Sequence, residues 1–138
     1  MVQRFRLIEH TADTGLIAFG KDLPEAYANA AFGMFSIMAD LNTVKEVETR
    51  TIEVHEEDLE SLLFEWLNRL LFFFDAEMLL LKRFDIVEFE ETRLKAICYG
   101  EKHDPKRHRQ IKIGVKSATY HTLTVDKEKH QVQVIFDI

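Results

Sequence analysis

The longest apolar stretch, LESLLFEWLNRLLFFFDAEMLLL at residues 59–81, places the strongest constraint on the fold. Its leucine and aromatic side chains recur at helical spacing and form one stripe. Five charged side chains interrupt it: Glu60, Glu65, Arg69, Asp75 and Glu77. Charged groups are costly inside a bilayer. The stretch therefore predicts an amphipathic helix of a soluble protein that buries its apolar stripe, and not a membrane span.

The remaining patterns predict an α+β fold. Strand-like runs at residues 5–8 and 15–20 precede a helix that begins near Asp22, with Glu25 at the reciprocal capping position. A further strand is expected at 45–55, with a bulge where its alternation slips between Thr49 and Ile52. Alternation with a period of two then predicts strands at 86–89, 94–99, 111–116, 122–125 and 131–136. We expect one domain, residues 1–138, with two helices packed on a largely antiparallel or mixed sheet.

Composition excludes several classes of function. The net charge is −6, whereas proteins that bind nucleic acid directly usually carry a basic stripe. A role near RNA would therefore be mediated by a protein partner. Cys98 is the only cysteine, so no disulfide forms within the chain, which fits a cytoplasmic protein. The opening MVQRFRLIEH has no apolar core or cleavage site typical of a secretory signal.

Enzyme motifs are incomplete. GLIAFGK at residues 15–21 approaches a phosphate-binding loop, but Asp22 follows where a serine or threonine would hold magnesium. None of the three serines lies in a Gly-x-Ser-x-Gly turn. Cys98 alternates with Leu94 and Ala96 on one strand face, which predicts a buried and unreactive thiol. The sequence therefore offers no nucleophile.

Two further features are open to more than one interpretation. The basic cluster KHDPKRHR at residues 102–109 is either a solvated connection between strands or a docking segment for an acidic partner or RNA phosphates. Phe72 falls nearly opposite the apolar stripe of its helix, beside Glu65 and Asn68. It either packs under a neighbouring loop or belongs to a partner surface.

Polar chemistry collects at both ends of the chain. IEHTADTGL at residues 8–16 sets Glu9, His10 and Asp13 after the first strand. In the last strand, alternating apolar residues point to the core, so Asp137 points the other way, followed by Ile138 with its α-carboxylate.

These groups could form an all-oxygen pocket if the two ends of the chain meet. Oxygen ligands favour calcium or magnesium over zinc. Two carboxylates about 4 Å apart repel by roughly 4 kcal/mol at an effective dielectric constant near 20, and a bound cation would offset that cost. Composition and periodicity do not establish that the ends meet.

The chain resembles the archease family in five segments over essentially its whole length. The segments are EHTADTGL (9–16), ESLLFEWLNRLL (60–71), DPKRH (104–108), KSATYH (116–121) and FDI (136–138). Two departures from the family pattern, Thr14 and Ser117-Ala118, lie beside the polar positions and leave them unchanged.

The resemblance implies a small α/β protein that is not itself an enzyme. Archeases activate the RtcB-type RNA ligase of tRNA splicing, promoting its guanylylation and repeated turnover, so RNA would be reached through the ligase. The implied metal ligands are Asp13, Asp137 and Ile138, with calcium as the first choice and magnesium or manganese as alternatives. Lys116 is implied to matter for activation. Weaker supporting roles fall to Glu9, His10 and His121, which would brace the site through hydrogen bonds.

Two other functions compete with ligase activation. A general chaperone or protein-interaction module would use exposed apolar residues such as Phe72. A metal-dependent hydrolase would need an open metal position and a base, which Glu9 or His10 could supply.

Overall fold

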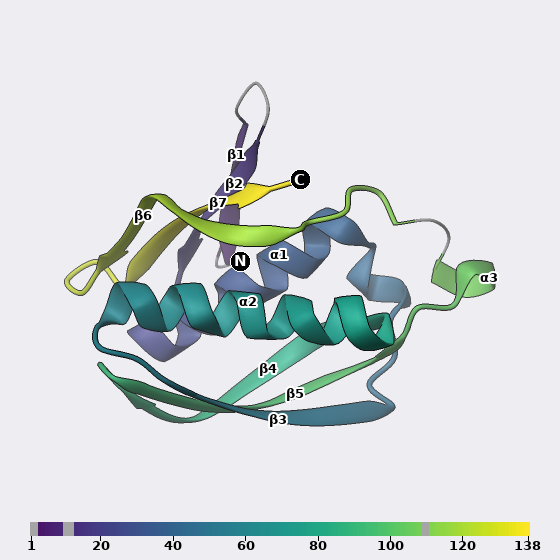
Figure 1. Ribbon diagram of the computed structural model, residues 1–138, viewed down its shortest axis with the longest axis horizontal. Coiled ribbons are helices and arrows are strands. Elements are labelled where there is room, and N and C mark those ends of the chain that lie inside the picture. The colour runs from purple at the N-terminus through teal and green to yellow at the C-terminus, as the bar shows by residue number, and fades with distance from the viewer. Residues whose placement is uncertain (1–2, 10–12, 109–110) are drawn as a thin grey trace.

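The computed structural model describes residues 3–9, 13–108 and 111–138, with only the main chain at Glu9. In this part of the chain two long helices lie between two antiparallel sheets (Figure 1). The elements are β1 (Phe5–Glu9), β2 (Thr14–Phe19), α1 (Leu23–Met38), η1 (Leu41–Thr43), β3 (Glu48–His55), α2 (Leu59–Glu77), β4 (Leu79–Glu90), β5 (Arg93–Lys102), α3 (Pro105–His108), β6 (Ser117–Asp126) and β7 (Gln131–Asp137).

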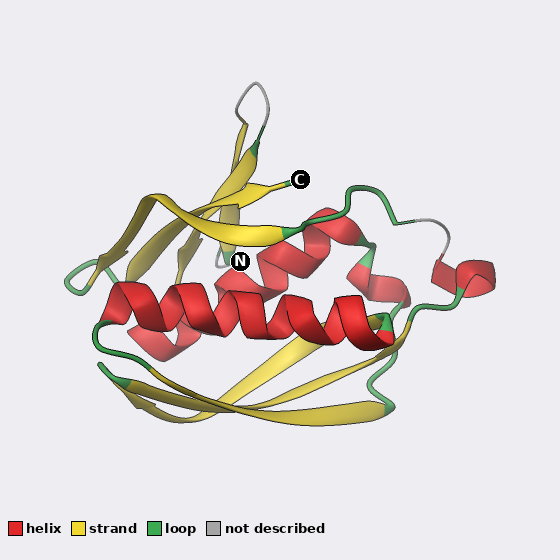
Figure 2. Cartoon of the chain, viewed as in Figure 1, coloured by secondary structure: helices red, strands yellow, loops and turns green. Residues whose placement is uncertain are grey.

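The strands divide between two sheets (Figure 2). One sheet has the order β1-β2-β7-β6 and the other the order β3-β5-β4, with all described pairings antiparallel. The predicted α+β class, with two main helices on antiparallel strands, is confirmed. The single sheet that we expected is two sheets, because β3, β4 and β5 pair only with one another among the described strands.

The core is the helix layer, which contacts both sheets. Helix α1 packs on β2 and on β4, and α2 packs on β6 and on β3, β4 and β5. Two hydrogen bonds link the helices inside this layer. The Tyr27 hydroxyl donates to the Leu59 carbonyl at 2.5 Å, and the Trp66 indole N–H donates to the Tyr27 carbonyl at 3.0 Å. Both aromatic side chains are fully buried, and burial raises the pKa of Tyr27.

Both helices begin where the sequence predicts. Asp22 caps α1 by accepting from the backbone N–H of Glu25 at 3.0 Å. Glu25 in turn accepts from the backbone N–H of Lys21 at 3.0 Å, one residue earlier than in the usual capping box. Asp58 caps α2 by accepting from the N–H of Ser61 at 2.8 Å. These short-range signals do not depend on the rest of the fold.

The end of α2 differs from the prediction. The helix stops at Glu77, Met78 adopts the left-handed conformation with φ 56°, and Leu79 starts strand β4. Leu81, which we assigned to the helical stripe, is therefore a strand residue. Leu79, Leu80 and Leu81 are all fully buried, and a short apolar run looks the same in a buried strand and a buried helix.

The bulge expected in β3 is also wrong, because β3 pairs with β5 without a register shift. Arg50 shares the inward face with Ile52 and Val54, and its charge made the alternation look broken. Its guanidinium bonds Glu77 at the end of α2 at 2.5 Å. An inward arginine is compatible with this strand because an acid from the covering helix pairs with it.

Residues 111–116, predicted as a strand, have no strand structure; the strand begins at Ser117 instead. Their alternating apolar residues do not follow one face, since Val115 is buried while Ile113 is 41% exposed. The segment is held to α1 by the N–H of Lys112, which donates to the Met38 carbonyl at 2.8 Å. Among the described residues, no helix is long and apolar enough to cross a membrane.

Gly100 provides a test of the β4–β5 pairing. A Cβ atom there would lie 1.9 Å from the Leu80 carbonyl oxygen, so Gly100→Ala must force the two strands apart. We expect a loss of about 2 kcal/mol or more in the free energy of unfolding, measured by urea denaturation. Gly114→Ala is the matched control, because a Cβ atom there meets nothing within 4 Å. Equal stability of the two variants would contradict the close approach.

Candidate functional site

The pairing of β2 with β7 joins the first and last parts of the sequence. The register runs from Phe19 opposite Gln131 to Thr14 opposite Phe136. Asp13 directly precedes Thr14, and Asp137 directly follows Phe136. Since the strands are antiparallel, Asp13 and Asp137 lie at the same end of this pair of strands. The structure therefore places two residues from opposite ends of the sequence at one end of the same pair of strands, and their joint role as metal ligands stays a prediction.

Ser117, the first residue of β6, and Lys116, just before it, lie at the same end of the sheet. We call the five residues at this end the acidic edge: Asp13, Lys116, Ser117, Asp137 and Ile138. Ser117 pairs with Asp137, and its hydroxyl donates to the Asp137 carboxylate at 3.3 Å. The N–H of Lys116 donates to the Asp137 carbonyl at 2.8 Å. Asp137 and Lys116 are exposed, and Ile138 is 42% exposed. The acidic edge is thus open to a partner.

The three residues with weaker predicted roles, Glu9, His10 and His121, do not all lie at the acidic edge in the described structure. The main chain of Glu9 pairs with Thr14 and so lies at the acidic edge, while its side chain and all of His10 lie outside the described residues. His121 is exposed in the part of β6 between Thr119 and Thr124 that has no partner in β7. The structure does not bring His121 into register with Asp137.

The chemistry of the acidic edge suits a hard cation. Asp13 and Asp137 supply carboxylate oxygens, and neither forms an ion pair with a residue in the described part of the chain. Carboxylates at one end of a sheet that lack a paired cation are candidates for binding a positive ion. Within residues 3–9, 13–108 and 111–138, no three His, Cys, Asp or Glu side chains are grouped closely enough to hold a metal on their own.

Asn68 of α2 is a residue that sequence reasoning noticed only as a neighbour of Phe72. Its carbonyl oxygen accepts from the N–H of Ala118 at 2.8 Å, and its amide donates to the Ala118 carbonyl at 3.4 Å. Strand β6 is the last strand of its sheet, so Asn68 occupies the edge that another strand would occupy. Asn68 thereby fixes the start of β6, where Ser117 meets Asp137.

The described part of the basic cluster, residues 102–108, is organised around a buried acid and is not simply solvated, while Arg109 lies outside the described residues. Glu101, 6% exposed, accepts from both terminal nitrogens of Arg107 and from the N–H of Lys45 at 2.5 Å. The buried His108 accepts from the N–H of Asp104 through Nδ1, so its Nε2 carries the proton and faces Glu101 at 3.1 Å. Hydrogen bonds from Arg107 above all lower the pKa of Glu101 to about 2. Arg107 and His108 therefore anchor α3.

Two single-residue predictions can also be assessed. Cys98 is fully buried and forms no disulfide, which confirms the predicted burial, and burial raises the pKa of its thiol to about 12. Phe72 is 61% exposed and lines a cavity of about 430 Å³ with Glu65, Asn68 and Arg69. Packing under a neighbouring loop is therefore wrong for Phe72, and its membership of a partner surface stays a prediction.

The fold and the acidic edge define a class: small α+β proteins whose two long helices lie between antiparallel sheets, with an acidic end where the second and last strands pair. The sequence pattern of the Archease protein family (MTH1598/TM1083) matches residues 5–138. The chain belongs to this family.

The chain is similar to archease proteins of other organisms over most of its length and theirs. The chain is 41% identical over 130 residues to the protein archease of Pyrococcus abyssi, covering 91% of this chain and 90% of the relative. It is 36% identical over 128 residues to the protein archease of Sulfurisphaera tokodaii, covering 92% and 91%.

Two solved structures are similar. The solution structure of protein 1598 of Methanobacterium thermoautotrophicum has a TM-score of 0.78 at 34% identity, covering 98% of this chain and 99% of that one. A crystal structure from Thermotoga maritima, described as an archease and possible chaperone, has a TM-score of 0.61 at 20% identity. The match covers 95% of this chain and 94% of the Thermotoga maritima chain, and at 20% identity it supports the fold alone.

The Asn68 contact predicts a local effect at the acidic edge. Asn68→Leu leaves the buried N–H and carbonyl of Ala118 without partners, at a cost of about 1–3 kcal/mol. Amide hydrogen exchange, followed by NMR, should become at least tenfold faster at Ala118 and faster at Lys116 as well. Arg69→Gln on the same helix surface is the control. Unchanged exchange at Ala118 in Asn68→Leu would contradict this role.

Glu101 predicts how stability depends on pH. The folded-state pKa of about 2 lies below the ordinary 4.5, so the contribution of Glu101 is complete above pH 4.5 and is lost as pH falls towards 2. Glu101→Gln should lower the free energy of unfolding at pH 7 by about 1–3 kcal/mol, and the difference from wild type should shrink between pH 4.5 and 2. Urea denaturation across this range measures it. The exposed Glu57→Gln is the control, and a pH-independent deficit for Glu101→Gln would reject the assignment.

Proposed function

We propose that this protein activates an RtcB-type RNA ligase in tRNA splicing and catalyses no reaction itself. Membership of the archease family supports the choice of partner. The sequence offers no nucleophile in an enzyme motif, and its one thiol is buried. The activation consists of promoting guanylylation of the ligase, so that each ligase molecule completes many turnovers.

The single observation that carries the proposal is the register that sets Thr14 opposite Phe136. Asp13 directly precedes Thr14 and Asp137 directly follows Phe136, so both residues belong to the same end of this pair of strands, with Asp13 half-buried and Asp137 exposed. Carboxylates at the end of a sheet can enter the cleft of another protein, whereas carboxylates inside a pocket can bind only a ligand that enters that pocket. The acidic edge therefore suits insertion into the active site of a partner enzyme.

In this proposal each residue of the acidic edge has its own task. Asp13, Asp137 and Ile138 hold a divalent cation, calcium by preference and magnesium or manganese as alternatives. When bound, the ion supplies positive charge for phosphate groups at the ligase site. Lys116 lies beside these residues and offers a second positive charge. Ser117 orients the Asp137 carboxylate.

The proposal also limits the other contacts of the protein. RNA is reached through the ligase, in keeping with a net charge of −6. Glu9, His10 and His121 keep secondary roles as residues that brace the site. We place the activity in the cytoplasm, where one unpaired and buried cysteine is compatible with reducing conditions.

Replacing either carboxylate tests the proposal. Asp13→Asn and Asp137→Asn keep the side-chain shape but remove the negative charge needed for a cation, so each should lower multiple-turnover ligation at least tenfold in an assay with the ligase, GTP and RNA ends. Lys116→Ala should lower it as well. The stability of each protein, measured by thermal denaturation, should change by less than about 0.5 kcal/mol, as for other surface substitutions.

Asp75→Asn is the matched control, since Asp75 is an exposed acid on α2 away from the acidic edge. Full stimulation by both Asp13→Asn and Asp137→Asn would reject the proposal. The competing function, a general chaperone, is favoured by the exposed Phe72. A chaperone would suppress aggregation of unrelated proteins equally well with and without these two carboxylates.

A further inference from the structure

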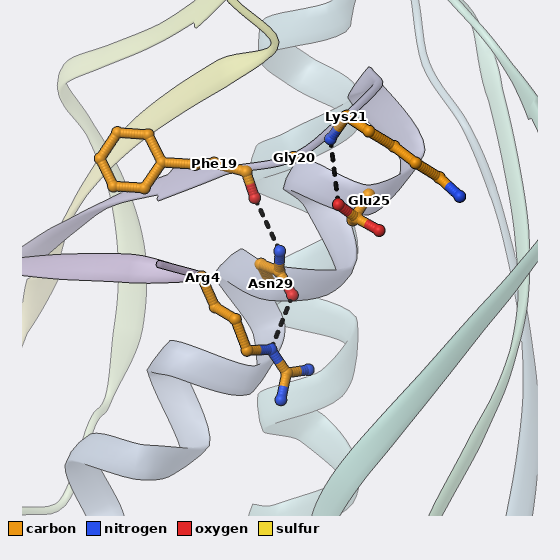
Figure 3. Close-up of a pocket in the computed structure, with 6 residues that line it drawn as sticks. All are labelled: Arg4, Phe19, Gly20, Lys21, Glu25 and Asn29. Atoms are coloured by element: carbon orange, nitrogen blue, oxygen red, sulfur yellow. Dashed lines mark hydrogen bonds between the residues drawn. The ribbon is translucent and has the colours of Figure 1, made fainter. Parts of the chain in front are cut away.

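A second polar site lies at the opposite end of β2, where the strand leads into α1. A cavity of about 680 Å³ lies there. Figure 3 shows the six residues that line it, Arg4, Phe19, Gly20, Lys21, Glu25 and Asn29. A neighbouring cavity of about 510 Å³ shares four of these residues and extends towards β4. Neither cavity includes a residue of the acidic edge.

Arg4 is held in a fixed orientation in this cavity. Its Nε donates to the side-chain oxygen of Asn29 at 3.0 Å, and its Cζ lies 3.6 Å from the centre of the Phe32 ring. The aromatic face sets the plane of the guanidinium, and the hydrogen bond sets its rotation within that plane. The two terminal nitrogens have no hydrogen-bond acceptor among the described residues, and Figure 3 shows them turned away from Asn29.

The orientation of Asn29 is itself determined by the fold. Asn29 is 7% exposed on α1, and its amide nitrogen donates to the Phe19 carbonyl at 2.6 Å. Its oxygen must therefore face Arg4. A buried amide with both ends bonded is a rigid support, so the fork of Arg4 is presented to the cavity before any ligand arrives.

Arg4 differs from most other arginines in the described part of the chain. Carboxylates pair with Arg50, Arg69, Arg83, Arg93 and Arg107. Arg6 and Arg4 form no ion pair with a described residue, and for Arg4 burial lowers the pKa, with only a partial opposing effect from Glu25. Arg4 is exposed, so its two terminal nitrogens are open to a carboxylate partner.

From these contacts we propose that the cavity binds a carboxylate, held by the two terminal nitrogens of Arg4. The planar fork matches the two oxygens of a carboxylate. The carboxylate comes either from a small organic acid or from an acidic peptide segment. The second source is accommodated by the neighbouring cavity, which continues past Lys21 to Arg83.

The charges around the cavity select a carboxylate over a phosphate. Glu25 lies between Arg4 and Lys21 on the wall of the cavity, and Asp22 lines the adjoining one. These acids repel a dianion about twice as strongly as a monoanion. Asp22 also caps α1, so the start of the helix has no free N–H group for a phosphate at that position.

The test follows the Arg4 Nε–H resonance by NMR in the isolated protein at constant ionic strength. The probes are sodium acetate, a capped hexapeptide of alternating alanine and glutamate, sodium phosphate and sodium chloride. Acetate and the peptide should give saturable shifts, phosphate a response at least fivefold weaker, and chloride none. Peptide affinity more than tenfold above that of acetate identifies an acidic peptide as the source, and comparable affinities identify a small acid.

Variants locate the site on Arg4. Arg4→Lys keeps the charge but loses the fork and the bond to Asn29, and it should weaken acetate binding about tenfold; the shifts are then read from the backbone amides of Gly20 and Lys21. Arg6→Lys, an exposed arginine of β1, should leave binding unchanged. Equal responses to all four probes, or unchanged acetate binding in Arg4→Lys, would overturn the proposal. The wild-type titration alone decides the question if Arg4→Lys does not fold, and none of these measurements involves the ligase.

Discussion

The pairing of β2 with β7 is the constraint on which the rest of the molecule depends. Residues 14–19 pair with residues 131–136, so more than a hundred residues of chain are enclosed between two neighbouring strands. Closing a loop of this length is costly in entropy, and six consecutive residue pairs with a buried face compensate for it. A shift of one residue would turn the inward side chains of one of the two strands, such as Leu16 or Val134, away from the helices and would change the position of Asp13 relative to Asp137. The register between β2 and β7 therefore determines both the packing of the core and the position of the acidic edge.

The sequence predicts elements well where the information is local. Asp22 caps α1 as expected, because a capping residue acts on backbone groups within three positions. The division into two sheets is long-range information that periodicity does not carry. The apolar run Leu79–Leu81 is compatible with a helix or a strand. Arg50 interrupts the alternation of β3, and its ion pair with Glu77, which allows an inward arginine there, is visible only in the three-dimensional structure. Both errors arise where tertiary contacts decide the structure.

The candidate site divides in the same way. Alternation along β7 was enough to predict that Asp137 points away from the core, and the structure agrees, with Phe136 buried and Asp137 exposed. The proximity of Asp13 depends on strand register, which a single sequence does not encode in a readable form. Asn68 and Asn29 were not predicted as functional because their importance lies in the backbone groups they reach, Ala118 and Phe19, far along the chain. No local pattern marks such contacts.

The acidic edge and the Arg4 cavity lie at opposite ends of one strand, which has a physical consequence. Strand β2 contains six residues, so the two sites are roughly 20 Å apart at about 3.3 Å per residue. That separation is about twice the Debye length at physiological ionic strength, roughly 8–10 Å, so the charge of one site does not neutralise the other. In the two proposals above, the sites therefore bind their ligands independently, a cation at one end and a carboxylate at the other. The rigid strand between them fixes their spacing, so a single partner that occupies both sites must present the two groups at that distance.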